Sequence, residues 1–252
     1  MTTAERRNII EEIIRENKEI EVNFIKEKFG VSSVTVRNDL IFLERKGVIK
    51  RLFGKAILRD ERLSSAFDMH SIKQIDEKEK IGKYAASVIN PGESVMLYTG
   101  TTTLQIAKYL PSQINIIAVT NSIHIAYELK KYPNVKTVVI GGNFNPDTGA
   151  TYGIQAIKQL NDYNIDKLFL AVDGINAETG ITNDQPYETD INRAMINKSK
   201  TVIVVADHTK VGTTRFINMG DIEKVDMLIT DTKADDNEIK KIKAKNVKVV
   251  LA

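Results

Sequence analysis

The stretch Val31-Ser32-Ser33-Val34-Thr35-Val36-Arg37-Asn38-Asp39-Leu40 decides how the beginning of the chain folds. Gly30, directly before it, can end a helix in the left-handed conformation. Ser32 can then cap the next helix, because its hydroxyl accepts a backbone N–H of the first turn. A turn this short between two helices predicts a helix-turn-helix, in which the second helix reads the major groove of DNA.

The second of these helices has two unlike faces. On a period of about 3.6 residues, Val36, Leu40 and Leu43 form one apolar stripe that would dock on a small domain. The other face is polar and includes Arg and Asn, which suit the edges of guanine and adenine. The side chains expected to contact bases or backbone from this helix are Ser33, Thr35, Arg37, Asn38 and Arg45. Ile41 and Phe42 also project outward, and they either pack under the following strands or contact DNA.

The residues before the turn predict two further elements. Thr2 and Glu5 match a capping box, and the helix that they open would end near residues 16–17. Residues 20–22 could form a short extended piece. The helix that leads to the turn would use Phe24, Ile25 and Phe29 for its core side.

Two strand-like runs follow the recognition helix and predict a β-wing. They cover residues 48–52 and 55–59 and are joined at Phe53-Gly54. Phosphate contacts from a wing fix the register of a protein on DNA while the helix reads bases. The basic wing side chains are Lys50, Arg51 and Lys55. Residues 30–59 hold seven Lys/Arg against two Asp/Glu, which is the charge that attraction to phosphates requires.

The composition is that of an ordinary globular protein of two domains. The chain has 252 residues, of which 42% are hydrophobic and 27% charged, with a formal net charge of +3. It has no Cys, and its three His residues stand far apart, so disulfides and local zinc motifs are excluded. No metal or cofactor is expected. No apolar run is long enough for a membrane helix and no signal-peptide pattern is present, which predicts a cytoplasmic protein.

The second part of the chain alternates strands and helices. Residues 60–76 lack periodicity and are interpreted as a linker, so we expect a winged helix-turn-helix domain at 1–59 and an effector-binding domain at 77–252. Within the latter the apolar strand-like runs are 94–97, 114–119, 135–140, 167–172, 201–205, 227–229 and 247–251. Amphipathic segments such as 104–110, 123–131 and 188–198 lie between most of them. This alternation predicts an α/β domain with a doubly wound parallel sheet.

Polar or glycine-rich turns follow five of these strands. Ligands in such folds bind at the carboxyl ends of the strands, and backbone N–H groups at the start of a helix suit a phosphate. A single Gly-Thr-Thr turn is better explained by helix capping than by a phosphate site, but five polar strand ends together favour a site of sugar-phosphate size. Its candidate residues are Thr99, Gly100, Thr101, Thr102, Thr120, Asn121, Gly141, Gly142, Asp173, Gly174 and Lys210.

Residues 1–59 resemble the winged helix-turn-helix of the DeoR family of bacterial transcription regulators. The resembling segments are Glu5-Arg6-Arg7, Phe29-Gly30-Val31-Ser32, Thr35-Val36-Arg37-Asn38-Asp39-Leu40 and Leu43-Glu44. Two positions depart from the family. Asn38 stands where a second basic residue is more common, and Leu52-Phe53-Gly54-Lys55-Ala56 replaces the usual His-Gly-Gly-Ala of the wing. Operator preference and wing contacts are therefore expected to differ from those of relatives.

The second domain resembles the effector domain of the same family, whose fold is related to ribose-5-phosphate isomerase and glucosamine-6-phosphate deaminase. The resembling residues are Gly100-Thr101-Thr102, Thr120-Asn121-Ser122, Gly141-Gly142, Asp173-Gly174, Gly180-Ile181-Thr182, Arg193-Ala194-Met195, Asp207 with Lys210, and Thr230-Asp231. The resemblance implies a phosphorylated sugar as effector. It places the phosphate at Thr101, Thr102 and Lys210, and sugar hydroxyls at Asp173 and Asn121.

One residue of this domain departs from the family pattern. Tyr98 stands where the family usually has Asp before the Gly-Thr-Thr turn, and its phenol either narrows the site or replaces a carboxylate contact. The Phe-Leu-x-Val-Asp-Gly and Gly-Ile-Thr segments are most similar to those of members from amino-sugar and galactosamine pathways.

Two classes of function fit these patterns. The first is a DNA-binding regulator, a repressor of a carbohydrate-utilisation operon that is controlled by a phosphorylated sugar and binds operator DNA as a dimer or tetramer. The alternative is a sugar-phosphate isomerase or deaminase that carries a DNA-binding module. Such an enzyme needs an acid or base near the substrate, and the candidates are Asp173, Glu188 and His208. Because the resemblance covers both domains, a regulator without catalytic residues is the expected class.

Overall fold

The chain forms two compact units, Met1–Lys73 and Gln74–Ala252. The structure is a computed structural model that describes residues 1–52, 54–58 and 66–252. The predicted turn residue Phe53 and residues 59–65 of the predicted wing and linker lie outside the described residues.

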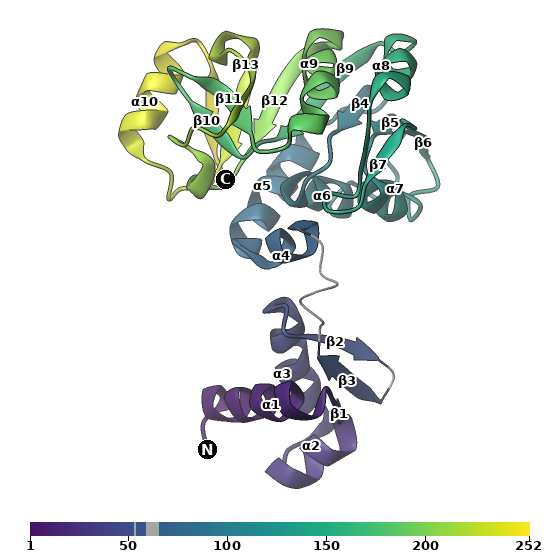
Figure 1. Ribbon diagram of the computed structural model, residues 1–252, viewed down its shortest axis with the longest axis vertical. Coiled ribbons are helices and arrows are strands. Elements are labelled where there is room, and N and C mark those ends of the chain that lie inside the picture. The colour runs from purple at the N-terminus through teal and green to yellow at the C-terminus, as the bar shows by residue number, and fades with distance from the viewer. Residues whose placement is uncertain (53, 59–65) are drawn as a thin grey trace. The chain divides into compact units, whose positions relative to one another are not determined.

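The first unit is a winged helix-turn-helix (Figure 1). Its elements are α1 (Thr3–Asn17), β1 (Glu19–Glu21), α2 (Val22–Phe29), α3 (Ser33–Arg45), β2 (Ile49–Leu52), β3 (Lys55–Leu58) and α4 (Ala66–Ile72). The capping box of Thr2 and Glu5 is present, and Gly30 ends α2 with φ of 60°. Ser32 caps α3 by accepting the N–H of Thr35, as its position predicts. Local sequence therefore sets both sides of the turn.

The core of this unit is formed by one face of each element. Val36, Leu40 and Leu43 of α3 are buried, which confirms the predicted apolar stripe. Burying such a side chain contributes about 1.5 to 3 kcal/mol, so the stripe largely determines how α3 is seated. The other members of the core are Ile10, Ile14, Ile20, Ile25, Val48, Ile49 and Ala56. The wing strands pair in the antiparallel order β1-β3-β2.

Helix α4 lies in the stretch expected to be a linker. Phe67 is buried. A Cβ added at Gly47, just after α3, would stand 2.4 Å from Cδ1 of Ile72. This segment therefore packs on the first unit through Ile72, a contact that no local periodicity in the sequence indicates.

The second unit is built on a seven-stranded parallel sheet with the order β15-β14-β12-β9-β4-β5-β6 (Figure 1). The strands are β4 (Ser94–Leu97), β5 (Ile116–Thr120), β6 (Val135–Val139), β9 (Ile165–Ala171), β12 (Ser199–Val205), β14 (Met227–Thr230) and β15 (Lys248–Leu251). The helices are α5 (Ile75–Ser87), α6 (Thr101–Lys108), α7 (Ile123–Leu129), α8 (Ile154–Asn161), α9 (Thr189–Lys198) and α10 (Asp236–Ala244). The predicted parallel sheet is confirmed.

The sheet has an apolar layer on each face. Val202 and Val204 of β12 join one core cluster with residues of α8, α9 and α10, while Ile203 and Val205 join the other with residues of α5, α6 and α7. Alternate side chains of a strand point to opposite faces, which explains why the strands are continuously apolar.

The chain reverses its direction across the sheet between β4 and β9. From β4 it proceeds to β5 and β6 on one side, and then returns to β9, β12, β14 and β15 on the other. In open parallel sheets this reversal leaves a crevice at the carboxyl ends of the two strands where ligands bind. Residues that follow β4 and β9 are therefore placed to contact a ligand.

Two small antiparallel sheets were not predicted. One is the hairpin of β7 (Asn143–Asn145) and β8 (Ala150–Tyr152), and the other joins β10 (Gly174–Asn176), β11 (Gly180–Asn183) and β13 (Ile217–Gly220). These strands are three or four residues long, and their polar and Gly content is typical of turns. Their pairing comes from distant segments, which sequence periodicity does not report.

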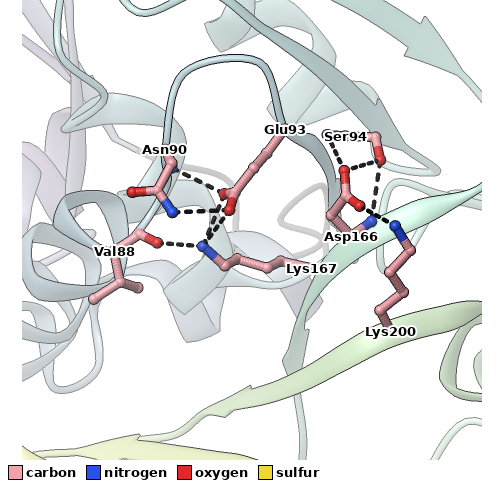
Figure 2. Close-up of polar contacts among 7 residues, drawn as sticks. All are labelled: Val88, Asn90, Glu93, Ser94, Asp166, Lys167 and Lys200. Carbon is pink, nitrogen blue, oxygen red and sulfur yellow. Dashed lines mark hydrogen bonds and ion pairs between the residues drawn. The ribbon is translucent and has the colours of Figure 1, made fainter.

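The amino ends of β4, β9 and β12 are joined by an ionic network (Figure 2). Lys167 Nζ donates to both carboxylate oxygens of Glu93, at 2.7 and 2.8 Å. Asp166 accepts the backbone N–H and hydroxyl of Ser94 and pairs with Lys200 at 2.7 Å. The Lys200 hydrogen bond, followed by those from Ser94, holds the pKa of Asp166 well below its usual range. This edge lies opposite the carboxyl ends of the strands.

Candidate DNA-binding and effector sites

The outward face of α3 is exposed and basic. Arg37, Asn38 and Arg45 are exposed, and their side chains have no hydrogen bond or ion pair with another described residue. Ser33 is exposed in the first turn, whereas the half-buried Thr35 bonds the Ser32 hydroxyl at 2.9 Å. Unpaired Arg and Asn side chains on a rigid helix are available to base edges or phosphates.

A buried ion pair fixes α3 against α1. Asp39 is only 1% exposed, and its carboxylate accepts Nε–H of Arg6 at 2.6 Å and of Arg7 at 2.8 Å. The guanidinium of Arg7 also lies 4.1 Å from the ring centroid of Phe42. The sequence alone leaves open whether Phe42 packs under the wing strands or contacts DNA. The structure places it on the outer side of α3, 44% exposed beneath Arg7.

The three basic wing residues differ in their surroundings. Lys50 is exposed and has no ion pair with a described residue. Arg51 donates its backbone N–H and Nε–H to Glu44, at 2.9 and 2.6 Å, and Lys55 pairs with Glu19 at 2.6 Å. Their charges are therefore partly balanced within the unit, which makes Lys50 the best placed of the three for a phosphate.

In the second unit, the turn after β4 begins the candidate effector site. A Cβ added at Gly100 would stand 2.4 Å from Cβ of Ala171, so only Gly allows this turn to lie against the end of β9. Leu104 N–H makes the first intrahelical bond, to Gly100 O, so the N–H groups of Thr101 to Thr103 have no acceptor inside α6. Thr101 is half-buried and Thr102 buried. Such N–H groups favour an anion.

Two residues at the end of β5 hold the loop that follows β4 in place. Asn121 is fully buried, and its amide accepts the N–H of Thr99 at 3.1 Å and donates to the carbonyl of Thr151 at 3.0 Å. Thr120 is also fully buried and donates its hydroxyl to Leu97 O at 2.7 Å. Both side chains hold the loop, and Asn121 offers no exposed atom for the sugar hydroxyl contact implied by the resemblance.

Packing requires glycine at two of the predicted site positions. A Cβ at Gly142 would stand 2.4 Å from the carbonyl oxygen of Tyr152, and one at Gly174 would stand 2.4 Å from that of Thr213. Gly141 donates its N–H to Gln159 at 3.0 Å. Close backbone approach therefore accounts for Gly142 and Gly174 directly.

The turns after β9 and β12 bring a carboxylate and an ammonium group together. Lys210 Nζ lies 3.9 Å from Oδ1 of Asp173, and both side chains are partly exposed. Asp173 Oδ2 also accepts the N–H of Asp184 at 3.3 Å. The pair stands across the reversal point from Gly100, where a ligand with a phosphate and hydroxyls finds a cation and an acceptor.

Tyr98 makes a buried contact with Glu188 that the sequence does not predict. The phenol, 6% exposed, donates to Glu188 Oε2 at 2.6 Å, and the carboxylate, 0% exposed, also accepts from Asn145 and Thr148. Burial, followed by the Glu188 charge, raises the pKa of Tyr98 well above its ordinary value, so the phenol keeps its proton. Asn192 Nδ2 approaches the phenol oxygen at 3.3 Å. The departure at Tyr98 is thus compensated by a buried partner 90 residues away.

The remaining acid–base candidate, His208, is held by Asp231. The carboxylate of Asp231 lies 3.0 Å from His208 Nδ1 and accepts the backbone N–H groups of His208 and Lys233. Burial opposes ionisation of Asp231, but these hydrogen bonds outweigh it and lower the pKa of the carboxyl. Among the described residues, no group of three or more His, Asp or Glu side chains is placed to hold a metal ion. No helix within residues 1–52, 54–58 and 66–252 is long and apolar enough to cross a membrane.

Family models match both units. Residues 6–62 match the DeoR-like helix-turn-helix domain, and residues 73–232 match the DeoR C-terminal sensor domain. The chain belongs to the DeoR family of transcriptional regulators. The resemblance stated from the sequence is confirmed, and the regulator is favoured over the enzyme.

Named relatives cover nearly the whole of this DeoR-family chain. An aga operon transcriptional repressor of Escherichia coli O157:H7 is 32% identical over 99% of this chain and 94% of its own length. The transcriptional repressor GlcR of Bacillus subtilis is 34% identical over 92% and 89%. The glycerol-3-phosphate regulon repressor of Escherichia coli K12 is 28% identical over 92% of both chains. These relatives are named as repressors and not as enzymes.

Similarity to solved structures is more distant. Ribose 5-phosphate isomerase A of Methanocaldococcus jannaschii aligns over 55% of both chains with 18% identity and a TM-score of 0.40. The sorbitol operon regulator SorC of Klebsiella pneumoniae aligns over 96% of this chain and 99% of its own, with 10% identity and a TM-score of 0.44. No functional assignment follows from either.

Proposed function

We propose that this DeoR-family regulator represses a carbohydrate-utilisation operon and that a phosphorylated sugar modulates its binding to the operator. The observation that carries the proposal is the outward face of α3, where Arg37, Asn38 and Arg45 are exposed and have no partner among the described residues. A regulator that binds operator DNA would act in the cytoplasm, where that DNA lies. The names of three relatives support the link to carbohydrate: an aga operon repressor, the repressor GlcR and a glycerol-3-phosphate regulon repressor.

On DNA, we assign two kinds of contact. Arg37 and Asn38, together with Ser33, Thr35 and Arg45, would face base edges and nearby phosphates, while Lys50 with Arg51 and Lys55 would bind the backbone. Two-fold oligomers match two-fold operators, with half-sites about one helical turn or a multiple apart. A homo-oligomer of this chain would therefore place two α3 helices on related half-sites.

The effector would bind at the carboxyl ends of β4, β9 and β12. The N–H groups that open α6 and the ammonium group of Lys210 suit a phosphate, while Asp173 suits a sugar hydroxyl. The effector can shift operator affinity only if it binds the two states of the protein unequally. Thr99 to Thr102, with Thr120, Asn121, Gly141, Gly142 and Gly174 behind them, would shape this site.

A gel-shift titration tests the proposal directly. The full-length protein is titrated onto the promoter DNA beside its own gene, with and without a panel of sugar phosphates and the matching free sugars. We expect at least one sugar phosphate, and not its free sugar, to change the apparent Kd. If none of them alters DNA binding, the sensing role is wrong, although the DNA-binding role is not affected.

A pair of lysine variants links the response to the site. Lys210→Met should leave DNA affinity unchanged without ligand and weaken the response to the active sugar phosphate. Lys240→Met, on the exposed side of α10, removes the same charge elsewhere in the unit and serves as the control. Equal responses from both variants would contradict a phosphate contact by Lys210.

A further inference from the structure

Two buried asparagines in the second unit have polar atoms without partners. Asn183, 4% exposed, lacks a hydrogen-bond partner at both Nδ2 and Oδ1 among the described residues. Asn192, fully buried, lacks one at Oδ1. Buried polar groups are nearly always hydrogen-bonded, because an unpaired one keeps its full cost of desolvation. Neither amide caps a helix or joins a turn, so their presence calls for another explanation.

The two amides lie near the same strand. Asn183 is paired with Ile217 of β13, and Asn192 Nδ2 lies 3.1 Å from the sulfur of Met219, two residues further along that strand. Paired residues, and residues two apart on a strand, share a face of the sheet, so the Asn183 side chain lies on the face where Asn192 contacts Met219. Asn183 also directly precedes Asp184, whose N–H bonds Asp173 of the candidate effector site. Asn192 in turn bonds Tyr98, which directly precedes Thr99, so each asparagine is one residue or one hydrogen bond away from a segment of that site.

Tyr98 determines which atom of Asn192 stays unpaired. Its hydroxyl proton is committed to Glu188, at 2.6 Å, so its oxygen can only accept. The Asn192 amide must then turn its Nδ2 toward Tyr98, at 3.3 Å, and keep its carbonyl oxygen for another donor. Through Tyr98, Glu188 thus fixes Asn192 as an acceptor.

Hydroxyl groups fit this arrangement better than any other group of a sugar phosphate. The unpaired atoms are two amide oxygens, which need donors, and one amide nitrogen, which needs an acceptor. A phosphate dianion cannot donate, and the buried Glu188, which bonds Tyr98 beside Asn192, would repel it. An ammonium group could satisfy the oxygens but not the nitrogen, whereas neighbouring sugar hydroxyls donate and accept.

We propose that Asn183 and Asn192 form a hydroxyl-recognising subsite of the effector site, with Tyr98 as the residue that positions Asn192. The inference rests on the proposed function, and it also predicts how the sugar phosphate is oriented. Its phosphate would lie at the start of α6 and at Lys210, and its hydroxyl-bearing carbons would point toward β13. Because both amides are enclosed, the ligand reaches them only when the surrounding chain opens. Hydrogen bonds made only in that opened state would give the effector unequal affinity for two states.

The test compares sugar phosphates with inorganic phosphate on the full-length protein by calorimetric titration. The sugar probes are a set of hexose 6-phosphates and pentose 5-phosphates, and the tightest binder is carried forward. Asn183→Val should lower the affinity for that sugar phosphate by about tenfold, because hydrogen bonds to it are lost, while the affinity for inorganic phosphate stays unchanged. The same variant should raise the thermal unfolding midpoint, since Val suits a strand and leaves no unpaired amide.

Tyr98→Phe provides a second variant that preserves the ring. It should lower the affinity for the sugar phosphate, and not that for inorganic phosphate, because the Asn192 amide loses its fixed orientation. If both variants keep the affinity for the sugar phosphate unchanged, the two amides bind only water and the proposed subsite is wrong. Sugar-phosphate sensing itself would not be affected by that result. Equal losses for the sugar phosphate and inorganic phosphate would also overturn it. If the unchanged protein binds no sugar phosphate, the proposed function itself fails.

Discussion

The buried carboxylate of Asp39 allows a quantitative prediction about how the recognition helix is held. It bonds Arg6 and Arg7 across 2.6 and 2.8 Å, and the side chain of Arg6 is itself only 9% exposed. In Asp39→Leu the guanidinium of Arg6 would stay buried without a counter-charge, which costs about 3 to 5 kcal/mol. The whole unit Met1–Lys73 is expected to be stable by roughly 4 to 11 kcal/mol, from about 0.05 to 0.15 kcal/mol per residue. The substitution should therefore remove a large part of that stability.

Hydrogen exchange read by mass spectrometry measures this loss in the full-length chain, which has no Trp for fluorescence. Protection in peptides of α1 and α3 should fall by about a hundredfold to a few thousandfold, because each 1.4 kcal/mol is tenfold. Peptides of β4 to β15 should not change. The control is Glu11→Ala, which breaks the partly exposed pairs of Glu11 with Lys46 and Arg15 and should cost about 1 kcal/mol or less.

The double variant Arg6→Met/Asp39→Leu separates loss of the ion pair from damage to packing. Removing both members of the buried pair leaves only Arg7, whose side chain is 24% exposed, without its carboxylate. Protection in the double variant should therefore recover a large part of what Asp39→Leu loses. If the two substitutions instead add their costs, the pair is not what fixes α3. A change of less than tenfold in Asp39→Leu would refute the magnitude itself.

Three further outcomes are expected. Arg37→Ala should cost about 1 to 3 kcal/mol on the operator and relax base preference, while Lys50→Ala should weaken all sequences alike and reduce the slope of affinity against salt by about 1; quantitative gel shifts at several salt concentrations decide. Gly100→Ala should destabilise the second unit by about 1 to 3 kcal/mol in calorimetry, since its Cβ would overlap the end of β9. Asp166 has a pKa below its ordinary value of about 3.9, so its stabilisation is present above that pH and is lost on acidification. Lys200→Ala should therefore unfold at a higher pH than the parent in an acid titration followed by circular dichroism; an unchanged midpoint would contradict the pairing.

The sequence predicted best what depends on neighbouring residues. Gly30 and Ser32 set the turn because each acts on its own backbone and the next few N–H groups. The stripe of Val36, Leu40 and Leu43 is visible because burial follows the helical period. In the second unit, the continuously apolar strands predict a parallel sheet, because strands that are buried on both faces carry apolar residues throughout.

Contacts between distant residues were not predicted, although one of them left a trace. Asp39 falls beside Leu40 on the buried side of α3, and a carboxylate in that position requires a partner. That partner, Arg6, lies 33 residues earlier. The bond from Tyr98 to Glu188 left no such trace, since Tyr is common next to strands and Glu188 precedes a helix. Its discovery required the fold.

The two edges of the parallel sheet differ in how they use their polar side chains. At the amino edge, Glu93 with Lys167 and Asp166 with Lys200 pair at 2.7 Å, and the carboxylates take further bonds from Asn90 and Ser94 (Figure 2). At the carboxyl edge, Asp173 and Lys210 stand 3.9 Å apart and stay partly exposed. Paired groups at one edge hold the strands in register, and loosely paired groups at the other cost little to rearrange. A ligand that exchanges its own phosphate and hydroxyls for these contacts can therefore change the carboxyl edge while the amino edge keeps the sheet intact.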